Sequence, residues 1–258
     1  LALPGRSPAD FPCLTPLSME APMREQYIEY RDGDALLEGF LCYDESQPGP
    51  RPAVLINHAW GGRDEFVERK ARRLAWQGYA CFAADNFGKG RRGSTNEECS
   101  ALMTPFMKDR RMLLRRLRAG LATLQALPIV DPKRVATMGF CFGGLCALDL
   151  ARSDADIRGA VSFHGMLKPS GLTEPRMRAR VLMLHGYDDP LAPPDDVLAV
   201  AREFTAAGAD WQIHAYGQTV HAFTNPQANN RAGGMQYDEA ADRRSWHALE
   251  EFLAEVLK

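Results

Sequence analysis

The chain has 258 residues, of which 45% are hydrophobic, and a formal net charge of −2 at pH 7. Its length allows a large buried core, and its near-neutral charge gives no overall electrostatic attraction to nucleic acid or to anionic membranes. No apolar run approaches the roughly 20 residues that cross a bilayer. We therefore expect neither a nucleic-acid partner nor a membrane-embedded protein.

The N-terminal segment does not resemble a secretory signal, because residues 1–18 contain no basic stretch followed by an apolar one. We therefore expect a cytoplasmic protein. Residues 1–22 are interpreted as an N-terminal arm or a segment introduced by cloning, and residues 23–258 as a single α/β domain. The six cysteines are an even number, but in a chain of this size without an export signal they are weak evidence for disulfides, and no CxxC pair indicates a redox or zinc site.

The pattern of hydrophobic residues predicts alternating strands and helices. Two strands at residues 26–30 and 36–43 flank a turn sequence with Gly33, which predicts a hairpin. Further strands are expected at residues 53–57, 79–84, 134–138, 157–163, 180–184 and 211–215. Helices are expected at residues 65–77, 110–127, from 142 onward, 195–207 and 238–257. This alternation predicts a mostly parallel central sheet with helices on both faces, which binds ligands beyond the carboxyl ends of its strands.

Residues 139–144, Gly-Phe-Cys-Phe-Gly-Gly, follow a predicted strand and open a predicted helix. They have the form of a nucleophile elbow, with Cys141 in the place where serine is usual. The glycines let neighbouring backbone pass the strained turn without a Cβ clash, and the helix N-terminus favours a thiolate. The alternatives are an inert buried cysteine and a phosphate-binding loop, although no P-loop sequence is present. We predict that Cys141 is the nucleophile.

A nucleophile elbow predicts an acid after a later strand and then a histidine near the C-terminus. Asp188 and Asp189 follow a predicted strand, and we choose Asp189 because it lies three residues beyond Gly186 and directly before Pro190. Asp188 is the alternative, and both carboxylates could simply cap a turn. His221 lies in the loop between the last predicted strand and the last predicted helix, so we predict that it is the base.

Three further histidines, His58, His164 and His185, also lie near predicted strand ends. Together with Asp189 they could be considered as metal ligands, but no HxH or HxxxH pair supports such a site. We therefore predict no metal and no cofactor.

With these residues the sequence resembles the dienelactone hydrolase family, a cysteine-nucleophile branch of the α/β-hydrolases. The resemblance covers the chain from Ala53 to its C-terminus. It rests on residues 57–62 (Asn-His-Ala-Trp-Gly-Gly), 77–79, 84–87 and 139–144, on Asp189 with Pro193, and on residues 221–223. The resemblance implies an α/β-hydrolase fold, a Cys141–His221–Asp189 triad, and an oxyanion hole made by the backbone N–H groups of Ala59 and Phe142.

The predicted substrate site departs from the family pattern. The best-known members carry a glutamate that contacts the resting thiol, where this chain has His58. They also bind the substrate carboxylate with two arginines, where this chain has Lys89 and Asn225. A single lysine binds a carboxylate less well than paired arginine forks, so the substrate need not be a dienelactone acid. The other predicted contact residues, which include the aromatic lining of a small apolar pocket, are Trp60, Phe87, His164, Tyr187 and Phe223.

These features predict a hydrolase that cleaves ester or lactone bonds of small molecules through a thioester acyl-enzyme. Amides are poorer substrates for a thiolate, because expulsion of the amine must compete with expulsion of the sulfur. The alternatives are a thioesterase or general carboxylesterase on the same scaffold, and a binding protein that kept the fold without catalysis. A redox-sensor role for Cys141 would need a resolving thiol such as Cys146. We expect a monomer or a homodimer.

Overall fold

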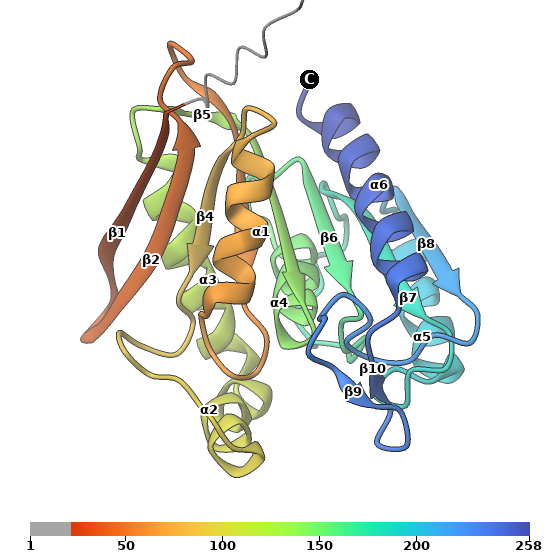
Figure 1. Cartoon of the computed structure of the whole chain (residues 1–258). Helices are drawn as coiled ribbons and strands as arrows, with labels where there is room; N and C mark the ends of the chain where they lie inside the picture. Colours follow the sequence, from red (N-terminus) through yellow and green to blue (C-terminus); the bar gives the residue numbers. More distant parts are fainter. Residues whose placement is uncertain (1–21) are drawn as a thin grey trace, which may run out of the picture.

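The computed structural model describes residues 22–258 and contains an eight-stranded sheet with the order β1-β2-β4-β3-β5-β6-β7-β8 (Figure 1). The strands are β1 Met23–Asp32, β2 Ala35–Asp44, β3 Arg51–Asn57, β4 Ala80–Ala84, β5 Val130–Phe140, β6 Gly159–Phe163, β7 Arg180–Gly186 and β8 Trp211–Tyr216. The segment expected at residues 1–22 lies outside the described residues, apart from Pro22.

The sheet is antiparallel at one end and parallel over the rest of its width. β1 and β2 form a hairpin, whose turn has Gly33 at φ +57°, and β2 pairs antiparallel with β4. The neighbouring pairs from β4–β3 to β7–β8 are all parallel. Because helices cover both faces, β4 and β6 are buried along their whole length. The predicted hairpin and the mostly parallel sheet are thus confirmed.

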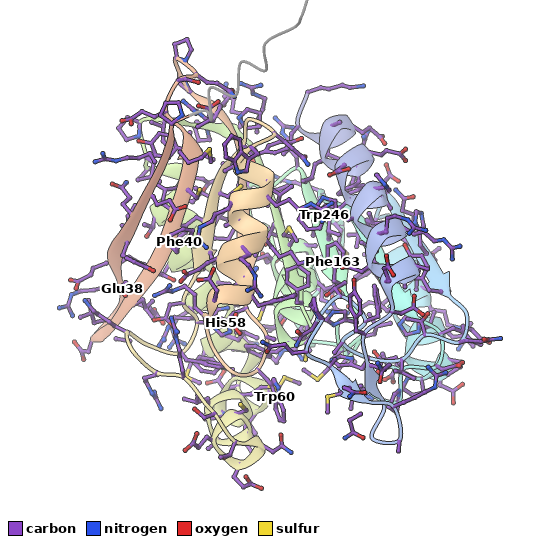
Figure 2. The ribbon with its side chains drawn as sticks, viewed as in Figure 1. Glu38, Phe40, His58, Trp60, Phe163 and Trp246 are labelled. Carbon is purple, nitrogen blue, oxygen red and sulfur yellow. The ribbon has the colours of Figure 1, made fainter. Side chains whose placement is uncertain are left out.

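Helices pack on both faces of this sheet (Figure 1). The helices α1 (Glu65–Ala75) and α6 (Glu239–Val256) contribute to one hydrophobic cluster. The helices α3 (Arg110–Gln125), α4 (Phe142–Arg152) and α5 (Pro194–Ala206) contribute to a second cluster on the opposite face. Phe163 and Trp246 mark the contact between the sheet and α6 (Figure 2).

Polar caps fix the start of several helices. The Asp64 side chain accepts a hydrogen bond from the Val67 N–H at the start of α1, and the Asp109 side chain accepts one from the Met112 N–H at the start of α3. Each such cap satisfies an otherwise unpaired N–H group and is worth about 1 kcal/mol.

Three features differ from the elements expected from the sequence. The helix α2 (Asn96–Lys108) was not expected, because it buries only Cys99 and Phe106 and contains Pro105. A hairpin of two-residue strands, β9 (Asn229–Asn230) and β10 (Met235–Gln236), is too short to give a hydrophobic period. The strand β5 begins four residues before the expected position 134, across a register shift in its pairing with β3.

The carboxyl ends of the parallel strands meet at one edge of the sheet, the lower edge in Figure 1. The loops after β3, β5, β7 and β8 all leave from this edge, so residues far apart in the sequence come together there. Within residues 22–258, no helix has both the length and the apolar character that a membrane crossing requires.

Candidate active site

Cys141 occupies the turn between β5 and α4 in a strained backbone conformation. Its φ of +56° and ψ of −116° lie in a region that non-glycine residues rarely adopt. A Cβ on Gly139 would lie 2.1 Å from the Gly143 carbonyl oxygen, and one on Gly143 would lie 2.1 Å from that of Asn57. Only glycine fits at these two positions, which explains the spacing of the motif. The turn leaves the half-buried Cys141 at the N-terminus of α4, with its N–H bonded to the Phe163 carbonyl oxygen (3.0 Å).

Asp189 lies just beyond the carboxyl end of β7 and is 1% exposed. Its Oδ1 accepts a hydrogen bond from the Leu191 N–H (2.8 Å), and its Oδ2 accepts one from Nδ1 of His221 (2.7 Å). The side chain of Asp188 is exposed, and its backbone N–H donates to the Thr219 carbonyl oxygen. The geometry therefore favours Asp189 over Asp188 as the partner of the histidine.

His221 is buried beside Asp189, which bonds one of its two ring nitrogens. Its Nδ1 carries a proton because its partner is a carboxylate, which only accepts, so Nε2 is the nitrogen left for the thiol. Burial lowers the pKa of His221, but a negative charge on Cys141 and the hydrogen bond and charge of Asp189 outweigh burial and raise that pKa to about 10. The site therefore stabilises an imidazolium next to the sulfur.

The loop that carries His221 is held by the β9–β10 hairpin. The His221 N–H donates to the Gly234 carbonyl oxygen (3.0 Å), and the Gln236 N–H donates to the His221 carbonyl oxygen (3.1 Å). Gly234 has φ +78°, and a Cβ there would lie 2.3 Å from Cγ of Pro190, the residue after the acid. The close approach at Gly234 thus joins the loop of the histidine to the loop of the aspartate.

His58 begins the loop after β3 and is fully buried, edge-on to Phe87 (ring centroids 4.6 Å). Its Nε2 accepts a hydrogen bond from the Asn86 N–H (3.0 Å), so its Nδ1 carries the proton and donates to the Ala59 carbonyl oxygen (2.6 Å). Burial lowers the pKa of His58, which keeps the ring neutral. His58, labelled in Figure 2, therefore orients the backbone at Ala59 and has no exposed surface for a substrate.

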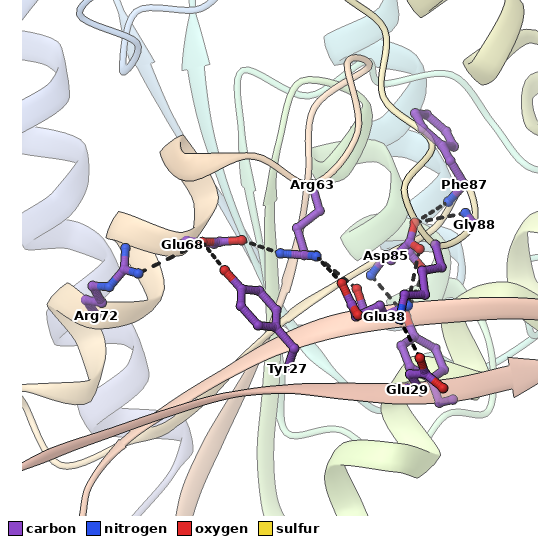
Figure 3. Close-up of polar contacts among 11 residues, drawn as sticks. Tyr27, Glu29, Glu38, Arg63, Glu68, Arg72, Asp85, Phe87 and Gly88 are labelled. Carbon is purple, nitrogen blue, oxygen red and sulfur yellow. Dashed lines mark hydrogen bonds and ion pairs between the residues drawn. The ribbon is translucent and has the colours of Figure 1, made fainter.

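Arg63 anchors the same loop, residues 58–64, to two other elements (Figure 3). Its Nε donates to the Glu38 carbonyl oxygen (2.9 Å) and its Nη2 to Glu38 Oε1 (3.2 Å), while Nη1 contacts the Glu68 carboxylate. Arg63 and Glu68 are both buried. The sequence analysis missed Arg63, because its partners on β2 and α1 become visible only once the chain is folded.

Several side chains predicted to contact substrate are placed in the core instead. Phe87, His164 and Phe223 are at most 3% exposed, so they offer almost no surface to a bound molecule. Their rings pack against other aromatic and histidine rings around the site. Trp60 is half-buried against the core and Tyr187 is 53% exposed, so these two retain surface for a substrate.

Lys89 does not stand free at the edge of the site. Its ammonium forms ion pairs with the carboxylates of Glu29 and Glu38 on the β1–β2 hairpin, the second at 2.9 Å. The sequence could not reveal these partners, which lie some 50 or more positions earlier in the chain. Asn225, at the other position expected to face a substrate carboxylate, accepts a hydrogen bond at Oδ1 from the Gln227 N–H (3.0 Å).

The histidine cluster does not form a metal centre. In the part of the chain from residue 22 onward, no three His, Cys, Asp or Glu side chains are arranged to hold a metal ion. Cys146, considered as a resolving thiol, is fully buried on α4, where burial raises its pKa well above the usual value.

The sheet order and the strained Cys141 turn, with an aspartate–histidine pair beyond β7 and β8, define an α/β-hydrolase fold. In agreement, residues 37–257 match the model of the dienelactone hydrolase family. The chain belongs to that family.

Solved structures of this family resemble the chain closely. One is a dienelactone hydrolase-like promiscuous phosphotriesterase, P91, from metagenomic libraries, which is 36% identical, with a TM-score of 0.87 over 92% of this chain and 99% of that one. A second, m3DLH, is 39% identical, with a TM-score of 0.86 over the same shares. Among curated relatives, a candidate carboxymethylenebutenolidase of Aquifex aeolicus is 23% identical over 90% of this chain and 99% of its own length.

Proposed function

We propose that the chain hydrolyses ester or lactone bonds of small molecules with Cys141 as nucleophile, His221 as base and Asp189 as its orienting acid. The observations that carry this proposal lie at the carboxyl ends of the parallel strands. Cys141 occupies a strained turn there, and Asp189 Oδ2 holds Nδ1 of the buried His221 at 2.7 Å. That arrangement serves to keep a thiolate ready to attack a carbonyl carbon.

The reaction would proceed in two halves. The thiolate of Cys141 forms a bond to the carbonyl carbon, and the carbonyl π electrons move to oxygen. The N–H groups of Ala59 and Phe142 would stabilise this oxyanion, at about 3 kcal/mol for each donor in comparable sites. The carbon–oxygen bond of the leaving group then breaks, and the His221 imidazolium gives its proton to the departing alkoxide or enolate.

In the second half, neutral His221 takes a proton from a water molecule, which attacks the thioester. The carbon–sulfur bond breaks, the acid product leaves, and the thiolate is restored beside the imidazolium. Asp189 stabilises the imidazolium and fixes the ring tautomer throughout. The chemistry needs no cofactor.

The substrate we propose is uncharged near the scissile bond. The ion pairs of Lys89 with Glu29 and Glu38 leave its ammonium largely neutralised, so it would bind a substrate carboxylate weakly. The accessible aromatic surface of Trp60 and Tyr187 suits an apolar acyl or alcohol group. Neutral esters and lactones should therefore exceed the dienelactone acid in kcat/KM.

A panel of substrates tests the proposal: p-nitrophenyl acetate, a neutral lactone, carboxymethylenebutenolide and a thioester. The wild type should turn over the activated ester and the lactone, and Cys141→Ala should not. Cys42→Ala, which removes a buried thiol between β2 and β4, serves as the matched control and should keep wild-type rates. Full activity of Cys141→Ala would refute the mechanism. Absence of any turnover by the wild type would favour the alternative of a non-catalytic binding protein.

A second candidate activity is phosphotriester hydrolysis, because the 36% identical P91 is described as a promiscuous phosphotriesterase. A chromogenic phosphotriester in the same panel would reveal it. We further propose that the enzyme is cytoplasmic, that residues 23–258 form one domain, and that it acts as a monomer or homodimer. Cell fractionation, limited proteolysis and sedimentation would test these three points.

A further inference from the structure

His164 lies at the carboxyl end of β6, in the centre of the sheet edge that carries the proposed site. Its φ is +38°, a backbone angle that residues other than glycine rarely adopt, and it is 3% exposed. Its N–H donates to the Leu184 carbonyl oxygen on β7 (2.8 Å). The fold therefore holds a large polar ring at a costly position next to the site.

The His164 ring contacts the loop of the proposed base twice. Its Nε2 is 2.8 Å from Oγ1 of Thr224, three residues after His221, and Thr224 is fully buried. The ring also meets the His221 ring edge to face, with centroids 5.1 Å apart and planes at 68°, and it meets Phe223 in the same manner at 5.1 Å. One side chain of β6 thus touches both the base and the segment that follows it.

His164 stays neutral beside the positive charge of His221. Burial, followed by the charges of His221 and Lys70, lowers the pKa of His164 well below its ordinary value. A neutral ring does not repel the imidazolium and does not hold the proton that His221 must transfer. The neutral His164 ring can therefore pack against the His221 ring and restrict its movement.

We infer that His164 and Thr224 are positioning residues, which together hold the His221 ring at the angle needed to pair with the Cys141 thiolate. This inference rests on the proposed function. Their hydrogen bond ties the end of β6 to the histidine loop, and the edge-to-face contact prevents the His221 ring from tilting away from the sulfur. Neither residue makes a hydrogen bond to Cys141 or to a ring nitrogen of His221.

The first test removes the hydrogen bond while keeping the shape of the side chain. Thr224→Val should lower kcat about tenfold with KM changed less than about twofold, because one lost hydrogen bond of ordinary strength misplaces the base. It should also slow the alkylation of Cys141 by iodoacetamide at neutral pH and move the midpoint of its pH profile upward. Thr224→Ser should restore both readouts. Thr123→Val, which removes a hydroxyl bonded to the Ala119 carbonyl oxygen on α3 (2.9 Å), is the matched control and should change neither.

A second variant removes the ring and keeps the backbone. Asparagine tolerates positive φ, so His164→Asn should fold, and it should lower kcat and shift the alkylation profile in the same direction. Folded Thr224→Val and His164→Asn proteins with wild-type kcat and alkylation profiles would overturn the inference. Alkylation requires no substrate, so it separates this failure from a failure of the proposed hydrolase activity, which the Cys141→Ala panel decides.

Discussion

Replacement of Arg63 by methionine should destabilise the protein strongly, because it breaks a buried ion cluster from one side. The side chains of Arg63 and Glu68 are 8% and 5% exposed, and Glu38 is 22% exposed. Methionine would fill part of the volume but leave the Glu68 carboxylate buried without its main cation. Breaking a buried pair in this way costs about 3–5 kcal/mol. The lost bond to the Glu38 carbonyl oxygen would also free the loop that carries Ala59, so kcat should fall as well.

Urea denaturation followed by circular dichroism would measure this loss, with Arg72→Met as the control. Arg72 also reaches Glu68, at 3.9 Å, but its side chain is 29% exposed and its other partners lie at the surface. Exposed ion pairs contribute about 0.2–1 kcal/mol each, so the control, which loses three of them, should lose less stability than Arg63→Met. Arg63→Lys, which retains one cation, should be intermediate and keep the test possible if Arg63→Met does not fold. Equal losses in Arg63→Met and Arg72→Met would refute the reasoning.

Three further predictions concern the aspartate, the histidine and the hairpin behind it. Asp189→Asn should lower kcat by about 10³- to 10⁴-fold in steady-state assays. The kcat of Asp188→Asn, at an exposed position, should stay within about twofold of wild type. A larger loss of kcat in Asp188→Asn than in Asp189→Asn would exchange the roles of the two aspartates. Because folding raises the pKa of His221 from 6.5 to about 10, its protonation stabilises the folded state fully below about pH 6.5, and this contribution is lost as the pH rises towards 10. The difference in unfolding free energy between wild type and His221→Gln should therefore shrink between about pH 6 and pH 10, and a constant difference would contradict the shift. Gly234→Ala should lose at least about 2 kcal/mol of stability and much of its activity. The control Gly208→Ala, with φ +62° and open space around it, should lose only about 1 kcal/mol. Similar losses for the two variants in a thermal melt would show that the contact between Gly234 and Pro190 is unimportant.

The parts of the fold that the sequence could predict are those with a strong local pattern. The apolar runs at β3, β4 and β6 follow from burial on both faces, and Gly33 marks the hairpin turn. The helix α2 has little local pattern, because it packs through few side chains, although Thr95 and Glu98 form a capping box that could have indicated its start. The hairpin β9–β10 depends on hydrogen bonds to His221, which no local pattern encodes.

For the candidate site, chain order and motif spacing select Cys141, Asp189 and His221 as candidates, and the structure has Asp189 bonded to His221 and all three beyond the carboxyl ends of the parallel strands. The contacts around them were not predictable in the same way. His164 follows the end of β6 and Phe223 lies in the loop after β8, and only the packing shows that both rings are buried against each other beside His221. The ion pairs of Lys89 likewise depend on how the β1–β2 hairpin lies relative to Lys89. The sequence pattern predicts the hairpin but not this position.

The order of the strands leaves β1 at one margin of the sheet, with backbone groups that could pair with a further strand. Half of its ten positions are charged: Arg24, Glu25, Glu29, Arg31 and Asp32. Charges along such a margin discourage the addition of a strand from another molecule, which is the first step of aggregation through open sheets. The same hairpin that forms ion pairs with Lys89 thus also opposes aggregation through β1, and variants that remove its charges should be less soluble even where Cys141, Asp189 and His221 are intact.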